Sequence, residues 1–181
     1  MQIRWLFSPW GGIIGRKNYR RCDMEFRTDV FSCFNRKWAL LTAGTKEDFN
    51  TMTISWGGLG TLWGKPVATV YVKPIRYTWQ FMERYDIFTV SFYSEDCRKD
   101  LALLGELSGR DGDKIARTKL TPAFLEEGVT FGQAELTLVC RKLYAQDLDR
   151  SAMPEDVRNA IYATEEPHRM FIGEVIDIVR P

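Results

Sequence analysis

The chain has 181 residues, with 25 lysines and arginines against 24 aspartates and glutamates, and its net charge is +1. This length suits one domain with a closed hydrophobic core, and the balanced charge gives little long-range attraction to nucleic acid or to an anionic membrane. The four cysteines lie far apart without a Cys-x-x-Cys pair, and His168 is the single histidine. This composition argues against a zinc site and a disulfide scaffold, and it suits the reducing cytoplasm.

The first 24 residues differ from the rest of the chain. Residues 1–15 are aromatic and apolar, but one serine, one proline and several glycines interrupt them, and the stretch is too short to span a membrane. Basic residues follow this stretch instead of preceding it, and it contains no A-x-A cleavage site, so it does not resemble a secretory signal. We expect residues 1–24 to form a loosely ordered extension and residues 25–181 to form the folded domain, and we hypothesise that Met24 is the natural start.

The remaining sequence predicts short strands separated by turns, with a few short helices. Apolar or alternating runs predict strands at 38–42, 51–56, 67–72, 88–93, 134–148 and 171–179. We expect one helix at 78–85 with Thr78 as its N-cap, and another after Ser94, where acidic residues suit the first turn. The glycine-rich segment after Trp56 is expected to form a turn. Strands linked mainly by turns favour an antiparallel barrel over a doubly wound sheet.

The predicted strand 51–56 carries small hydroxyl side chains on one face. Because strand side chains alternate, Thr51, Thr53 and Ser55 point one way while Met52, Ile54 and Trp56 point the other. Short hydroxyl side chains leave room for a flat ligand, and exposed backbone amides could bind its polar edge. An ordinary half-buried strand would show the same alternation.

A second cluster follows the strand 67–72 and combines cations with hydroxyls: Lys73, Pro74, Arg76, Tyr77 and Thr78. Such a cluster suits a phosphate group. The common nucleotide motifs are absent from the nearby glycine-rich segment, because Leu59 and Pro66 break a Walker loop and Trp63 breaks a GxGxxG pattern. Phosphate binding here would therefore use another geometry.

Seven blocks in register resemble the flavin reductase-like, FMN-binding family, and most closely its flavoredoxins. They are FNRKWALLTAG (34–44), NTMTISWGGLG (50–60), VKPIRYT (72–78), FTVSFY (88–93), LSGRDGDK (107–114), AELTLVCRKLYAQDL (134–148) and HRMFIGEV (168–175). The resemblance spans residues 26–179. It implies a mainly β fold with short helices, namely a split β-barrel with Greek-key topology. It also implies a homodimer with FMN near the subunit interface.

The resemblance also implies which residues bind the cofactor. The strand over residues 50–56 would lie along the flavin and its ribityl chain. Residues 76–78 would lie near the phosphate, residues 107–114 would be a second anion-binding segment, and Phe171 would lie near the ring. The matched positions are Asn50, Thr53, Ser55, Trp56, Arg76, Tyr77, Thr78, Ser108, Lys114 and Phe171. Trp56 could instead be structural and Arg76 a solvated surface residue. Phe171 and His168 could equally lie in the core or on the surface, and we do not predict His168 to be a general base.

A flavin accepts hydride by itself, so no catalytic side chain is required. The leading hypothesis is an FMN-dependent oxidoreductase that takes hydride from NAD(P)H and passes electrons to an acceptor. One alternative is a flavoredoxin-like electron carrier that exchanges electrons with partner proteins. Another is a non-catalytic module that stores flavin or holds haem. Metal, nucleic-acid and membrane binding are not expected.

Overall fold

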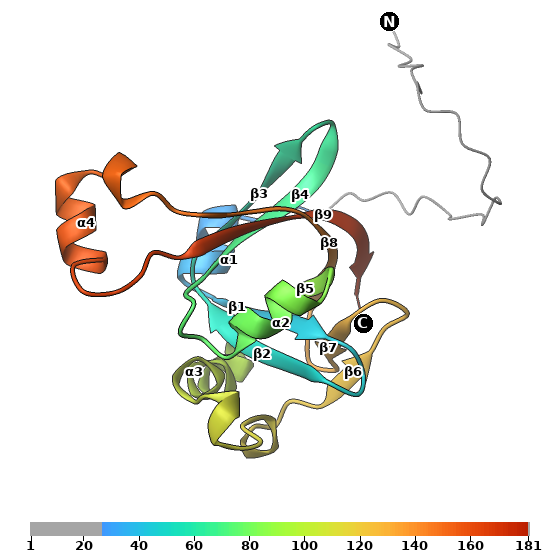
Figure 1. Ribbon diagram of the computed structural model, residues 1–181. Coiled ribbons are helices and arrows are strands. Elements are labelled where there is room, and N and C mark those ends of the chain that lie inside the picture. Colours follow the sequence, from blue (N-terminus) through green and yellow to red (C-terminus); the bar gives the residue numbers. More distant parts are fainter. Residues whose placement is uncertain (1–26, 181) are drawn as a thin grey trace, which may run out of the picture.

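The computed structural model describes residues 27–180 (Figure 1). The predicted extension, residues 1–24, and the hypothesis about Met24 lie outside the described residues. Within residues 27–180, no helix is long and apolar enough to cross a membrane. Cys33, Cys97 and Cys140 are buried free thiols in this part of the chain.

Seven strands form one antiparallel sheet that curls around the core (Figure 1). The order across the sheet is β2-β1-β5-β8-β9-β4-β3, and this arrangement confirms the predicted mainly β, split-barrel fold. The strands are β1 (Ala39–Gly44), β2 (Phe49–Ile54), β3 (Gly57–Leu62), β4 (Lys65–Val72), β5 (Ile87–Phe92), β8 (Leu136–Asp147) and β9 (Arg169–Val179). The six predicted strands all form, with their ends shifted by a few residues.

Of the helices, the first precedes β1 and the others lie in the connections between strands. They are α1 (Val30–Asn35), α2 (Thr78–Arg84), α3 (Arg98–Glu106) and α4 (Glu155–Ile161), with short 3-10 turns at Glu95–Cys97, Gly109–Asp111, Ile115–Arg117 and Arg150–Ala152. The link through α2 carries the chain from β4 to β5, which two other strands separate in the sheet. After α3, a small hairpin of β6 (Pro122–Phe124) and β7 (Val129–Phe131) leads to β8.

Inward-facing residues of the barrel strands form the main core. Val70, Phe88 and Leu138 are almost fully buried there, and Phe34 of α1 reaches the same cluster. The ring of Phe34 meets Phe92 edge to face, with the ring centroids 5.6 Å apart. A second cluster lies between α3 and the sheet, where α3 buries Leu101 and Leu104. This second cluster fixes α3 against the edge of the barrel.

Two local predictions are wrong. The glycine-rich segment after Trp56 is the strand β3, and the turn is confined to Trp63 and Gly64, whose φ angles of 52° and 72° allow a two-residue hairpin. Tyr77, not Thr78, occupies the N-cap of α2. The Thr78 hydroxyl does not cap the helix because it accepts a hydrogen bond from the Asn50 side chain.

Ser94 precedes a helical turn as predicted, but its side chain makes no capping hydrogen bond. The turn over Glu95–Cys97 is 3-10, with Glu95 and Asp96 in it, and α3 begins only at Arg98. The acidic residues therefore lie just before the α-helix, where they still face its positive end.

We predict that Gly57→Ala destabilises the fold. A Cβ at residue 57 would lie 2.4 Å from the Phe34 ring, and relieving such overpacking typically costs about 1–3 kcal/mol. Chemical denaturation measures the free energy of unfolding. Gly58→Ala is the matched control, because nothing lies within 4 Å of a Cβ there. Equal unfolding free energies for the two variants would contradict the close packing of α1 on β3.

Candidate functional site

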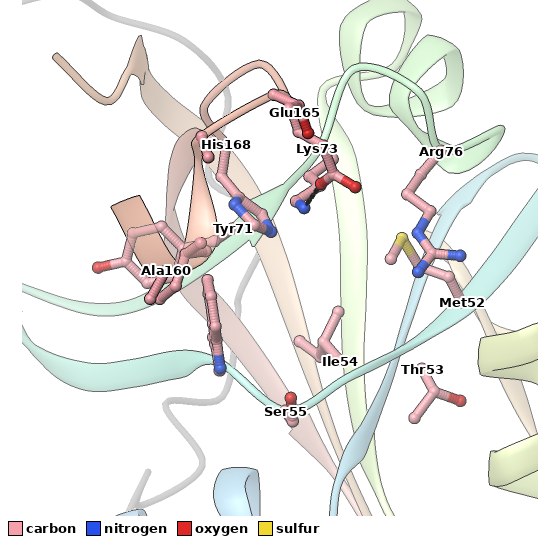
Figure 2. Close-up of a pocket in the computed structure, with 14 residues that line it drawn as sticks. Met52, Thr53, Ile54, Ser55, Tyr71, Lys73, Arg76, Ala160, Glu165 and His168 are labelled. Carbon is pink, nitrogen blue, oxygen red and sulfur yellow. Dashed lines mark hydrogen bonds and ion pairs between the residues drawn. The ribbon is translucent and has the colours of Figure 1, made fainter. Parts of the chain in front are cut away.

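Two adjoining cavities lie beside the edge strand β2. We call the one lined by the end of α3 and the residues after β4 the basic cavity, and its volume is about 370 Å³. The other, of about 560 Å³, lies along residues 52–56 and is called the strand cavity (Figure 2). Four lining residues are common to both, and they are Met52, Lys73, Arg76 and Glu165. The two cavities therefore adjoin, and together they are called the groove.

The basic cavity takes its charge from three separate segments. Lys73 and Arg76 come from the turn after β4, in which the Arg76 amide donates to the Lys73 carbonyl at 3.0 Å. Arg110 and Lys114 come from the segment that follows α3. Four cationic side chains thus line a small cavity, which is the electrostatic setting for an anion.

Lys114 is the most deeply placed of these cations. Only 5% of its surface is exposed, and its ammonium group donates to the carbonyls of Leu104 (2.9 Å) and Leu107 (3.1 Å) at the end of α3. Burial, with a smaller effect of Arg76, lowers the pKa of Lys114 to about 8. An ammonium has three donors, so these two carbonyls leave one donor for a ligand. Lys114 thus lines the basic cavity, and its contact with the cofactor stays a prediction.

Asn50 and Thr78 form the buried polar floor of the basic cavity. The Asn50 amide donates to the Thr78 hydroxyl at 2.7 Å, and both residues are buried. Gly109 approaches them so closely that a Cβ there would lie 2.5 Å from the Asn50 side-chain oxygen. Asn50 therefore lines the basic cavity and not the strand cavity.

Side-chain contacts join the two loops that border the basic cavity. The Arg110 guanidinium donates to the Ile75 carbonyl at 2.8 Å and lies 5.2 Å from the centre of the Tyr77 ring. The Arg76 guanidinium donates to the Gly105 carbonyl at 3.3 Å. The turn before α2 and the segment after α3 are therefore fixed to each other across the mouth of the cavity.

The hydroxyl face of β2 is covered by α3, which corrects the expectation that it stays open for a ligand. The Thr53 hydroxyl donates to the Leu101 carbonyl of α3 at 2.5 Å. Thr51 is buried, and its hydroxyl shares a 2.9 Å hydrogen bond with that of Thr42. The small side chains thus allow the close approach of the helix, and only Thr53 and Ser55 of this face line the strand cavity.

Aromatic side chains and the histidine close the far end of the strand cavity. The rings of Trp56 and His168 lie 4.9 Å apart, and His168 Nδ1 shares a 2.9 Å hydrogen bond with the Tyr162 hydroxyl. Burial, together with the nearby charges of Lys73 and Arg76, lowers the pKa of His168 to about 4. The imidazole is therefore neutral at physiological pH, and this end of the groove carries less positive charge than the basic cavity.

The structure brings nine of the ten predicted site residues to the groove. Phe171 is the correction, because it is fully buried in the barrel core, with its ring centroid 5.9 Å from that of Trp79, and it lines neither cavity. The other nine are Asn50, Arg76, Tyr77, Thr78, Ser108 and Lys114 in the basic cavity and Thr53, Ser55 and Trp56 in the strand cavity.

Sequence reasoning missed the wall that residues 160–165 add to the strand cavity, including Glu165. These residues form the end of α4 and the segment after it in the excursion between β8 and β9, which contains no binding motif. Arg110 belonged to a recognised block, but its two contacts across the cavity mouth depend on the tertiary fold.

Comparison with known proteins agrees with this fold. Flavoredoxin from Methanosarcina acetivorans is 21% identical, with a TM-score of 0.62 over 80% of this chain and 68% of that one. The FMN-binding protein from Thermus thermophilus, solved with p-hydroxybenzaldehyde, is 17% identical, with a TM-score of 0.65 over 92% and 82%. The styrene monooxygenase flavin reductase from Pseudomonas putida S12 is 18% identical, with a TM-score of 0.59 over 80% of each chain.

The sequence itself matches a family model over most of its length. No curated protein sequence matches the chain significantly. The model described as the flavin reductase like domain matches residues 31–181, which include all the strands and the whole groove. The chain therefore belongs to the family of flavin reductase-like domains.

Proposed function

We propose that this protein is an FMN-binding oxidoreductase. The observation that carries the proposal is the groove of two adjoining cavities, which has a buried cationic end and an aromatic end with a neutral imidazole. FMN has matching ends, because a ribityl chain joins a phosphate dianion to a flat ring. The combined cavities have the size and the few convergent polar groups of a small-molecule site.

The residues of the basic cavity fit the phosphate of this cofactor. Arg76 offers a forked cation, Thr78 a hydroxyl and Lys114 its remaining donor. Asn50 holds the Thr78 hydroxyl in place and so positions it. Arg110 supplies a further charge at the mouth. The phosphate would thus meet the buried donors of Thr78 and Lys114 together with the exposed cations of Arg76 and Arg110.

The strand cavity fits the ribityl chain and the ring. Ser55 and Thr53 line it with small polar groups, and Trp56 offers a flat aromatic face at its end. β2 is an edge strand, so its outer side has backbone donors and acceptors that pair with no other strand. When bound, FMN would supply the hydride acceptor, and the chain's contribution is to bind it, orient it and limit its access to water.

The two leading hypotheses, a flavin reductase and an electron carrier, differ in the source of the electrons. A flavin reductase takes hydride from NADH or NADPH, whereas a flavoredoxin-like carrier receives electrons from a protein. Similarity to both kinds of protein supports the class without choosing between them. Stopped-flow mixing of the oxidised flavoprotein with each nicotinamide decides, because rapid bleaching of the flavin absorbance supports the reductase and none supports the carrier. A preference of the apoprotein for haem would instead support the binding module.

A homodimer in the cytoplasm is also part of this proposal. Trp56 and Ile161, both at the strand cavity, expose much apolar surface, which a second subunit would cover. The buried free thiols suit a reducing compartment.

The purified protein should be yellow and should contain about one FMN per subunit in a dimer. Size-exclusion chromatography with light scattering and absorbance detection gives the mass and the flavin content in one run. Release of the cofactor and its chromatography identify it as FMN, FAD or riboflavin. A colourless protein that does not quench added FMN fluorescence would refute FMN binding, and a flavin-loaded monomer would refute the dimer.

Arg76→Ala should weaken FMN by about tenfold and riboflavin far less, because riboflavin lacks the phosphate. A hydrogen bond to a charged group is worth roughly 1.5–3 kcal/mol, but Arg76 is exposed and water screens part of this energy. Fluorescence titration gives both dissociation constants. Arg84→Ala is the matched control, since Arg84 lies at the other end of α2 and pairs with Asp48. If Arg76→Ala weakens both ligands equally, the phosphate does not lie in the basic cavity.

FMN affinity should fall as the pH rises through about 8. The lowered pKa of Lys114 means that the free protein loses this ammonium in that range, and with it a donor for the phosphate. The phosphate itself is already doubly ionised, because its second pKa is about 6. Titrations of FMN and riboflavin between pH 7 and pH 9 measure the effect, with riboflavin expected to change little. The fall in FMN affinity near pH 8 should disappear in Lys114→Met. If it persists in this variant, a titratable group other than Lys114 causes it.

A further inference from the structure

The excursion between β8 and β9, residues 149–168, forms one wall of the strand cavity. Its base is closed by the Leu148 amide, which donates to the His168 carbonyl at 2.9 Å. Arg169 binds both carboxylate oxygens of Asp147 at 2.7 and 2.9 Å just below it. The helix α4 of this excursion lies apart from the barrel in Figure 1.

The excursion holds its own shape with few contacts to the barrel. α4 has no buried residue, and Tyr162, of which 3% is exposed, is the one buried side chain between residues 149 and 168. Arg150 donates to the carbonyls of Tyr162 and Ala163 within the excursion. The segment is therefore held by hydrogen bonds within itself and by hydrogen bonds at its two ends.

An ion pair between Glu165 and Lys73 ties this unit to the barrel. Figure 2 shows the two side chains meeting between His168 and Arg76, at the junction of the two cavities. Lys73 also lies 6.0 Å from the centre of the Tyr162 ring. Because Glu165 and Lys73 line both cavities, a ligand in either one meets this pair.

Glu165 opposes the charge of the basic cavity. It is the one acidic side chain among the residues that line this cavity within the described part of the chain, and the cations Lys73, Arg76, Arg110 and Lys114 line the same cavity. A phosphate dianion in that cavity would attract Lys73 and repel the Glu165 carboxylate. The carboxylate therefore takes a cation that an anionic ligand would otherwise use.

We propose that the Glu165–Lys73 ion pair is a latch that holds residues 149–168 over the strand cavity, and that a phosphate group in the basic cavity releases it by competing for Lys73. The release lets residues 149–168 move away from the strand cavity, so that a second substrate can enter it. This inference rests on the proposed binding of a phosphate-bearing flavin. The ion pair itself is independent of that proposal.

Hydrogen exchange by mass spectrometry tests the latch without any ligand. Glu165→Gln removes the ion pair but keeps the size of the side chain. Peptides covering residues 149–168 should then exchange about two- to fivefold faster than in the flavin-free wild type. The change is small because a partly exposed ion pair contributes little free energy. Glu166→Gln is the matched control, because Glu166 is exposed and lines neither cavity. Equal exchange in the two variants would overturn the latch.

The same measurement with ligands tests the release. Saturating FMN or inorganic phosphate should speed exchange of residues 149–168 in the wild type, whereas riboflavin should not. Glu165→Gln should show no further rise and should bind FMN about two- to fivefold more tightly, since it has lost a competing charge. If FMN binds but slows this exchange, the inference fails while the proposed function stands. If the protein quenches the fluorescence of neither FMN nor riboflavin in the titration, the proposed function fails. The comparison of the ligand-free variants still shows whether the ion pair holds residues 149–168.

Discussion

The contact between the end of α3 and the edge strand β2 determines the shape and the charge of the groove. The Thr53 hydroxyl binds the Leu101 carbonyl, and Gly105 leaves room for Thr53, because a Cβ at residue 105 would already lie 3.1 Å from the Thr53 side chain. The last carbonyls of α3 then point to where Lys114 can reach them. Without this contact the basic cavity would have neither its wall nor its deepest cation.

The position of Lys114 shows how a folded chain keeps a buried cation. A charge removed from water is costly unless polar groups surround it, and the free carbonyls at a helix end are suitable partners. Two of them stabilise the ammonium, yet burial still lowers the pKa of Lys114 to about 8. An anion in the same cavity would compensate the remaining cost, so the ligand-free site is prepared for negative charge.

The two ends of the groove differ in chemistry because different elements build them. Turns and a helix end supply the charged donors of the basic cavity, whereas an edge strand and an aromatic cluster supply the strand cavity. Lys73 and Glu165 lie where the two meet, and they connect the excursion after β8 with the turn before α2. A charge bound at one end can thus influence the wall at the other end through a single ion pair.

The sequence by itself indicated the main strands and nine of the residues that line the groove. Alternating and apolar runs indicated six strands, since burial of one or both faces leaves a pattern within a few neighbouring residues. The segment around Arg76 and Thr78 pointed to phosphate for the same reason, because its donors are close along the chain. These features depend on local chemistry, which a single sequence displays.

Only the tertiary structure decided which residues meet across the fold. The hydroxyl face of β2 lies under α3, Asn50 holds Thr78 from 28 positions away, and Phe171 lies in the core. Its inward position follows from the pairing of β9 with β4, in which Phe171 lies opposite Val70. Register, helix docking and the pairing of Glu165 with Lys73 across 92 positions involve residues far apart in the sequence. Their encounter is fixed by packing of the whole barrel, so no local pattern could reveal it.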